Sequence, residues 1–308
     1  MKALPLVLLL FLVFGCKKSD DSATPDAGVN AIILTPKQLS LPIGSYDAGN
    51  YGIYSVLVGN SIYLGSASNS GKPQFFVRYT ISSNSFSSAL ALSSNVCACG
   101  YSSHLVGDGT NIFYVANDAT KYTASANSWA TITYPTMARD NNGEAGVGYA
   151  NGNIYFVGGR TASNLFKYYN ISQDKWFTAP NYLYATNRNQ LANYKDRLYV
   201  LGGDGALRKM AYFSTTSNTW TALKDTPFDV NSSYDSSFTA VLGDYLYLLQ
   251  GDSIYIYDLA NDVWATNPTK IDGLTSTGNM FSNGQKLYIA GKSTSNIPFI
   301  YEIAVSTK

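Results

Sequence analysis

Short hydrophobic runs separated by polar turns recur along most of the chain. Each run mixes β-branched, aromatic and aliphatic residues and is bounded by Gly, Asn or Asp, which is typical of a buried strand. The polar pair before most runs is Gly-Asn, Gly-Asp, Lys-Asp or Gly-Gln and indicates a tight hairpin turn, because these residues tolerate positive φ. The runs place an aromatic side chain at one equivalent position: Tyr63, Phe113, Tyr155, Tyr199, Tyr247 and Tyr288.

A second aromatic marker sets the period of the repeat. It recurs at steps of 43, 47, 44, 44 and 44 residues, as Tyr79, Tyr122, Tyr169, Phe213, Tyr257 and Tyr301. Four of these are followed seven positions later by a tryptophan, which uses every tryptophan in the chain: Trp129, Trp176, Trp220 and Trp264. Phe86 takes the tryptophan position after Tyr79. One unit is therefore four antiparallel strands in roughly 44 residues, the length of one propeller blade.

The last unit has no tryptophan strand, so the ring needs another way to close. An open ring would leave two unpaired sheet edges, which promote aggregation. The run "NAIILTPKQLSLP" near the N-terminus is strand-like and belongs to no unit of its own. We expect it to supply the missing outer strand of the sixth blade. The prediction is an all-β, six-bladed propeller formed by residues 31–308 as one domain, long enough to bury a sizeable core.

The repeat resembles the kelch motif, in which a glycine pair is followed by Tyr, six further residues and Trp. The third unit carries Arg139, Gly158-Gly159, Tyr169 and Trp176, and the fourth carries Arg188, Gly202-Gly203, Phe213 and Trp220. Other units keep the aromatics but have Ala116-Asn117, Gln250-Gly251 or Ala290-Gly291 in place of the glycine pair. The resemblance covers about 270 residues and implies the fold rather than a function. The repeated aromatics are interpreted as scaffold between blades.

The first fifteen residues predict a secretory signal. One Lys is followed by an apolar run that is too short, with these flanks, to span a membrane. The sequence Val13-Phe14-Gly15-Cys16 resembles a bacterial lipobox, although Phe14 is bulkier than the usual residue there. The resemblance implies cleavage before Cys16 and a lipid on that cysteine; an ordinary signal peptide cut elsewhere is the alternative. Residues 16–30 are polar and predict a flexible tether.

The start of this tether bears on where the protein is anchored. The run Lys17-Lys18-Ser19-Asp20-Asp21 resembles the export signal of Bacteroidota surface lipoproteins. That resemblance implies the outer leaflet of the outer membrane, with the propeller facing outward. A periplasmic location is the alternative. The protein would then meet a membrane only through the lipid on Cys16.

Charge and cysteine content limit which partners and metals the chain is expected to bind. The formal net charge is +1, with 21 basic and 20 acidic residues, so a nucleic-acid partner is not expected. Cys97 and Cys99 could form a local disulfide, be two small buried residues, or be half of a metal site. Only His104 lies nearby as a further ligand, so we expect neither a metal nor a cofactor.

The single histidine also limits catalysis. A copper oxidase resembling galactose oxidase needs two histidine ligands and a Tyr–Cys cross-link, which this chain cannot supply. A Ser-His-Asp arrangement through His104 is formally possible. However, His104 lies at the start of a predicted inner strand, which favours a packed or turn-capping side chain.

The candidate ligand-binding residues lie in loops at the mouth of the ring, where kelch propellers commonly meet their ligands. These are the loops between blades and those joining second and third strands. Their charged and aromatic members are Arg139, Asp140, Glu144, Arg160, Arg188, Asp204, Arg208 and Tyr234. Arg139 and Arg188 match the arginine of the kelch repeat and could clamp a carboxylate or sugar. The alternative is that they brace the blade junction.

The sequence favours a monomeric, non-catalytic, lipid-anchored propeller that binds a glycan or an envelope protein. The alternative is a sugar-modifying enzyme resembling the kelch-type sialic-acid mutarotases and epimerases. That enzyme would need an acid–base pair facing the mouth; Glu144 is the best acid, and the sequence shows no convincing base. A third interpretation, an assembly factor for other envelope proteins, predicts an exposed apolar patch.

Overall fold

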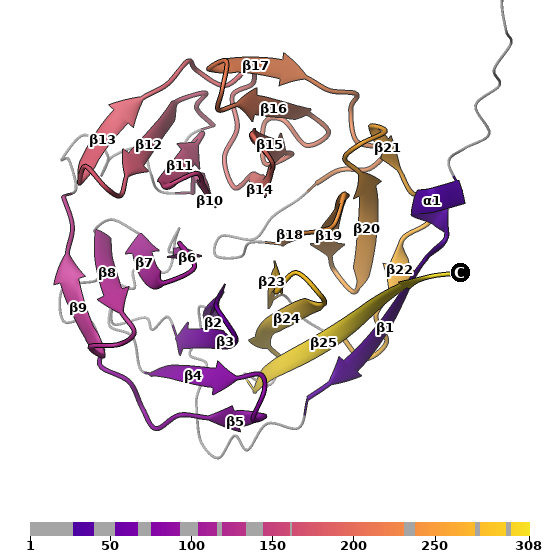
Figure 1. Ribbon diagram of the computed structural model, residues 1–308. Helices are drawn as coiled ribbons and strands as arrows, with labels where there is room; N and C mark the ends of the chain where they lie inside the picture. The colour runs from indigo at the N-terminus through magenta and orange to yellow at the C-terminus, as the bar shows by residue number, and fades with distance from the viewer. Residues whose placement is uncertain are drawn as a thin grey trace, which may run out of the picture.

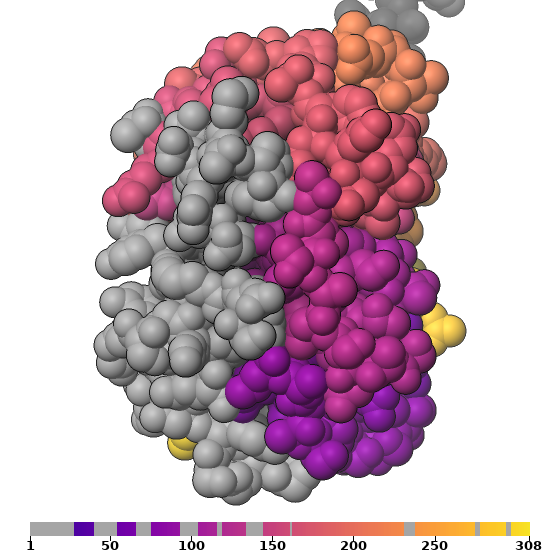
Figure 2. Space-filling model, turned by 90° about the vertical axis from the view of Figure 1, so that its left-hand side faces the viewer, coloured from indigo at the N-terminus to yellow at the C-terminus, as the bar shows by residue number. Residues whose placement is uncertain are grey.

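The computed structural model describes residues 27–39, 53–66, 75–92, 104–115, 119–133, 144–160, 162–230, 238–274, 278–293 and 297–308. These residues form six antiparallel sheets arranged around one axis (Figure 1). The predicted six-bladed propeller is confirmed. Figure 2 looks onto the outer rim, where segments of the first blades follow one another in chain order from bottom to top.

The first three blades each run from an inner to an outer strand in sequence order. Blade 1 is β2 (Ile53–Val58), β3 (Ser61–Ser66), β4 (Phe76–Thr80) and β5 (Ser85–Phe86). Blade 2 is β6 (His104–Gly107), β7 (Asn111–Val115), β8 (Ala119–Thr123) and β9 (Ser128–Thr131). Blade 3 is β10 (Gly146–Ala150), β11 (Asn153–Val157), β12 (Phe166–Asn170) and β13 (Lys175–Thr178).

The second half of the ring repeats this order, with two departures. Blade 4 is β14 (Gln190–Tyr194), β15 (Arg197–Leu201), β16 (Met210–Ser214) and β17 (Thr219–Ala222). Blade 5 is β18 (Thr239–Leu242), β19 (Tyr245–Gln250), β20 (Ser253–Asp258) and β21 (Val263–Trp264), and the extra strand β22 (Thr269–Lys270) also pairs with β20. Blade 6 is β23 (Gly278–Ser282), β24 (Leu287–Lys292), β25 (Pro298–Thr307) and β1 (Ile32–Gln38).

The ring closes through β1, as the sequence predicts. This strand runs antiparallel to β25, with Ile32 opposite Thr307 and Gln38 opposite Tyr301 (Figure 1). Ile32 and Leu34 are buried in the same apolar cluster as blade 5. Immediately before β1 lies the short helix α1 (Ala27–Asn30). The outer edge of blade 6 is therefore paired rather than open.

The repeated aromatics hold neighbouring blades together. In blades 2 to 5 the tryptophan lies directly opposite its aromatic partner on the adjacent strand: Trp129 opposite Tyr122, Trp176 opposite Tyr169, Trp220 opposite Phe213 and Trp264 opposite Tyr257. The rings also reach back to the preceding blade, since Phe166 of blade 3 packs 4.7 Å from Phe213 and 4.9 Å from Trp220 of blade 4. Such contacts add about 0.5–1.5 kcal/mol per pair beyond the area they bury. The scaffold interpretation agrees with this packing.

Hydrogen bonds at the outer rim also link neighbouring blades. Tyr169 donates to Asp174 at 2.6 Å, and Asp174 accepts from both the backbone N–H and the hydroxyl of Thr133 in blade 2. Trp176 donates through Nε1 to the carbonyl oxygen of Thr133 at 2.8 Å. Trp129 and Trp220 donate in the same way to preceding-blade carbonyls, those of Ala91 and Pro180. In blades 2 and 3 the turn residues Asn127 and Asp174 thus hold the segment that follows the outer strand of the previous blade.

Candidate functional site

The segment joining blades 3 and 4 is polar yet buried. Thr186 donates to the carbonyl oxygen of Gly202 at 2.9 Å, and Asn189 donates to that of Val157 at 3.0 Å. Gln190 accepts from the backbone N–H of Phe238 in blade 5 at 2.6 Å. Buried polar groups are stable only when they are hydrogen-bonded, and these bonds tie three blades together. This hydrogen-bonded segment, residues 186–190, is called the floor of the junction between blades 3 and 4.

Glycines of the kelch-like pairs let this floor approach the neighbouring loops. Gly158 has φ +76° and Gly203 has φ +88°, in the left-handed region that favours glycine. A Cβ atom at Gly158 would collide with the carbonyl oxygen of Thr186, and one at Gly203 with that of Asn187. The glycine pairs thus serve backbone packing at the junction between blades 3 and 4.

Three of the predicted site residues form one charged cluster on this floor. The guanidinium of Arg188 contacts Glu144 through Nη2 at 3.0 Å and Asp204 through Nη1 at 2.9 Å. Asn187 also donates to the Glu144 carboxylate, at 3.1 Å. Glu144 and Arg188 both adopt positive φ, +67° and +55°, which costs about 1 kcal/mol or more per residue. Surrounding contacts therefore hold both residues in strained conformations.

The cluster gives Arg188 the contacts of a junction brace. Both of its terminal nitrogens already face carboxylates, and the side chains of Arg188 and Glu144 are 19% and 10% exposed. One positive and two negative charges leave the cluster with a net charge of −1. An incoming carboxylate would have to displace Glu144 or Asp204 and would meet that negative charge. Ligand binding by Arg188 stays a prediction.

The remaining predicted residues do not join this cluster. Arg160 is exposed directly after the Gly158-Gly159 pair. Arg208 forms an ion pair with Asp229, with Nε 2.6 Å from Oδ1, and both side chains are about half exposed. Several predictions fall outside the described residues, namely those for Arg139, Asp140, Tyr234, Cys16, Cys97 and Cys99.

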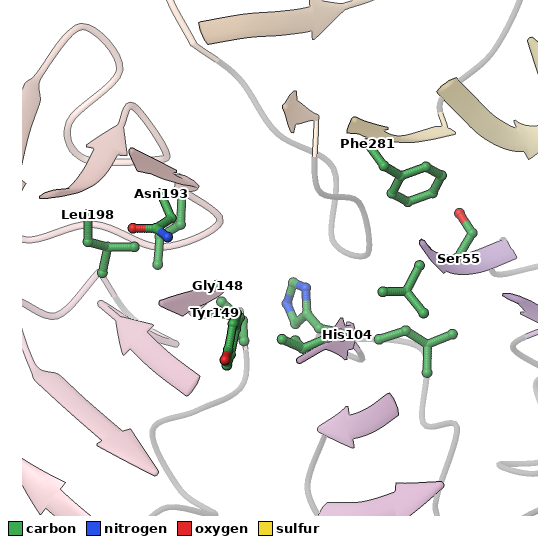
Figure 3. Close-up of a pocket in the computed structure, with 13 residues that line it drawn as sticks. Ser55, His104, Gly148, Tyr149, Asn193, Leu198 and Phe281 are labelled. Carbon is green, nitrogen blue, oxygen red and sulfur yellow. The ribbon is translucent and has the colours of Figure 1, made fainter. Parts of the chain in front are cut away.

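A cavity of about 170 Å³ lies on the axis of the ring. The inner strands β2, β6, β10, β14 and β23 supply most of its wall, and neighbouring inner strands pack side by side around the axis. Figure 3 shows the lining side chains, with His104 near the middle of the group and Phe281, Ser55, Tyr149 and Asn193 around it. None of the described lining residues carries an acidic or a lysine or arginine side chain.

His104 is the one titratable imidazole in this wall. It lies at the start of β6, as the sequence predicts for an inner-strand residue. Burial lowers the pKa of His104 from 6.5 to about 4, against a hydrogen bond with the backbone of Ala145 that acts in the opposite direction. The ring is therefore neutral near pH 7. Its Nε2 atom is buried and has no hydrogen-bond partner among the described residues.

Sequence reasoning missed Tyr149, Asn193 and Phe281 as candidate site residues. Each lies within an inner strand, whereas the predicted ligand-binding residues were all taken from loops. The one available signal is Asn193, an exposed polar residue within the otherwise buried pattern of β14. Ser55 also lines the cavity, but its hydroxyl is already used, donating to the carbonyl oxygen of Ala290 at 3.1 Å.

Two features are absent from the described part of the chain. No group of three or more His, Cys, Asp or Glu side chains there could hold a metal ion. Within the same residues, no helix has both the length and the apolar character needed to cross a membrane.

Comparisons with known proteins support the architecture. No protein-family model matches the sequence, and no curated protein matches it. Among solved structures, the chain is similar to the one titled "Structure of YjhT", with a TM-score of 0.61 and 13% sequence identity. The match covers 87% of this chain and 99% of that chain. The shared feature is the propeller fold.

Proposed function

We propose that this protein is a non-catalytic, kelch-type binding propeller of the cell envelope. A lipid on Cys16 anchors it to the outer membrane, facing outward, and the loop face of the ring binds a glycan or a protein. The observation that carries the proposal is the contrast at this face. The charged side chains of the Glu144–Arg188–Asp204 cluster satisfy one another, whereas the axial cavity has a described wall that is uncharged and partly polar.

This contrast favours binding over chemistry. General acid–base catalysis needs a group that can exchange a proton with the substrate at the working pH. Glu144, the acid that a sugar-modifying enzyme would use here, accepts from both Arg188 and Asn187. His104 is buried, and its pKa of about 4 makes it a weak base near pH 7. We therefore rank a sugar-modifying enzyme second.

The proposed anchor agrees with the position of the N-terminal segment. The last four residues of the predicted tether, Ala27–Asn30, form α1, which lies at the outer rim beside the closing strand β1 (Figure 1). A tether attached at the rim leaves the loop face of the ring open to a ligand. The lipobox-like Val13-Phe14-Gly15-Cys16 and the Lys-then-acidic run that follows support the outer-membrane location.

A thermal-shift screen of the full chain in detergent micelles tests the binding function. The panel contains neutral monosaccharides, sialic acid and polysaccharide fragments. A ligand at ten times its Kd should add about 1.4 kcal/mol and raise Tm by roughly 2–3 °C. The variant Gln285→Ala, which changes an exposed side chain in the turn before β24, serves as the control and should keep the shift.

Protein ligands are tested in parallel by passing solubilised envelope proteins over the immobilised full chain. Failure of every glycan and every envelope protein to bind would contradict the proposal. NMR of each panel sugar detects chemical conversion. Conversion of any of them would contradict the non-catalytic assignment and support the alternative, a sugar-modifying enzyme.

A further inference from the structure

We infer that the axial cavity binds one uncharged sugar unit, held by hydrogen bonds to Nε2 of His104 and the side-chain amide of Asn193. This inference rests on the proposed binding function and names the ligand class and the site. The unit is either a free monosaccharide or the terminal residue of a longer glycan.

The size of the cavity sets the first limit. Its volume of about 170 Å³ equals the liquid share of roughly six water molecules, at about 30 Å³ each. Pockets for drug-sized ligands usually measure about 300–1,000 Å³. The space therefore suits a single ring, and the rest of a longer ligand must lie outside the cavity.

The wall combines apolar surface with a few polar groups. Phe281, Val147 and Leu191 contribute apolar faces, while Tyr149 and Asn193 add a hydroxyl and an amide. Asn193 is exposed, so its amide can meet a ligand without rearrangement of the strand. A sugar ring presents the same combination, because its C–H faces are apolar and its hydroxyl groups both donate and accept hydrogen bonds.

His104 specifies which kind of hydrogen bond the ligand must make. The hydrogen bond to the backbone of Ala145 raises the pKa of the imidazole. It therefore stabilises the protonated form, which means that a ring N–H donates to the backbone oxygen. In a neutral imidazole the other nitrogen is then an acceptor. The buried Nε2 atom lacks a partner, and a buried acceptor without one is unfavourable. Because Nε2 has almost no accessible surface while the cavity is empty, the imidazole must turn towards the cavity before a ligand hydroxyl can supply the missing donor.

Charge excludes acidic and basic sugars from this cavity. A carboxylate placed there would lose its hydration without meeting a cationic partner in the described wall. An ammonium group would likewise meet no carboxylate in that wall. Arg188, a cation at the loop face, is already shared between Glu144 and Asp204. The ligand class is therefore neutral.

The single histidine of the chain gives a direct reporter of this site. The full chain, without an affinity tag that contains histidine, is labelled with ¹⁵N-histidine and studied in detergent micelles. It is titrated with D-glucose, D-galactose, D-mannose and N-acetyl-D-glucosamine, and with glucuronate and galacturonate as charged counterparts. We expect the Nε2 resonance to shift saturably with at least one neutral sugar, and binding of its uronate to be about tenfold weaker or worse.

Two variants separate the site from general effects on the fold. Asn193→Ala removes an exposed amide and should weaken binding about fivefold, the loss expected for one hydrogen bond. Asn267→Ala is the matched control, because Asn267 is an exposed amide on the connection between β21 and β22. It should leave binding unchanged.

Three results would overturn the inference: an unmoved Nε2 resonance with every neutral sugar, equal binding of the uronates, or full affinity in Asn193→Ala. If one of these occurs while the full chain still binds a glycan or an envelope protein, only the axial site is wrong. If no ligand of any class binds, the proposed function fails as well.

Discussion

At the scale of single residues, His104 links the axial wall to the stability of the whole domain. Its pKa is about 4 in the folded protein and 6.5 for an ordinary histidine. Between these values the unfolded chain binds a proton that the folded chain rejects. Folding stability is therefore greatest above pH 6.5 and falls as the pH falls towards 4.

The expected loss of stability from His104 alone is about 2 kcal/mol between pH 7.5 and pH 5.0. Urea denaturation at these two values and at pH 6.0 measures it. His104→Gln keeps a neutral polar side chain and should show a flatter profile over this range. Parallel profiles for the two proteins would show that His104 does not carry the effect.

The residues of the mouth show what the sequence can and cannot predict at this scale. Glu144, Arg188 and Asp204 were each identified as loop residues with a charge. The sequence did not predict that these three residues pair with one another. Arg188 lies 44 positions from Glu144 and 16 from Asp204, and it contacts them only when blades 3 and 4 pack. The kelch resemblance offered bracing as one of two roles for Arg188, and its observed contacts are those of a brace.

At the scale of elements, the aromatic repeat predicted which strands make up each blade, because an aromatic side chain fills the equivalent place in each blade junction. The same reasoning could not reveal the role of α1. Asn30 accepts hydrogen bonds from both the backbone N–H and the hydroxyl of Thr266, each at 2.9 Å. Asp174 binds Thr133 in the same two-pronged way in a regular blade. Asn30 thus replaces the turn residue that blade 6 lacks, 236 positions from its partner.

Removal of this clamp should be measurable. Asn30→Ala leaves the backbone N–H of Thr266 to water and should lower the free energy of unfolding by about 1 kcal/mol. Asn30→Asp keeps the acceptor and should retain most of the stability. Urea denaturation compares both variants with Asn267→Ala, a nearby exposed amide. An unaltered unfolding midpoint for Asn30→Ala would contradict a role in ring closure.

At the scale of the whole molecule, the spacing of about 44 residues was enough to predict the number of blades and the closing strand. The axial cavity could not be predicted. Its wall is assembled from inner strands of five blades, and its width depends on how these strands lean around the axis. A sequence period states how many blades there are, not which side chains meet at their centre.

The proposed lipid anchor on Cys16 also belongs to this scale. Cys16→Ala removes the thiol that the lipid would modify, so we expect the protein to move from the membrane fraction to the soluble fraction, with Tm unchanged. Cell fractionation with detergent phase partitioning measures the first effect. Protease treatment of intact cells distinguishes the outward-facing from the periplasmic location. Continued membrane association of the variant would contradict lipidation at Cys16.

The pairing of β1 with β25 also sets an order for folding during synthesis. The strand that closes the ring leaves the ribosome before the other described strands of the propeller, and its partner, Pro298–Thr307, emerges more than two hundred residues later. Until then β1 has no sheet to join, and the edges of the first and last completed blades stay open. A chain cut short before β25 keeps those edges exposed to aggregation and proteolysis. Ring closure therefore also acts as a check that the chain has been made in full through β25.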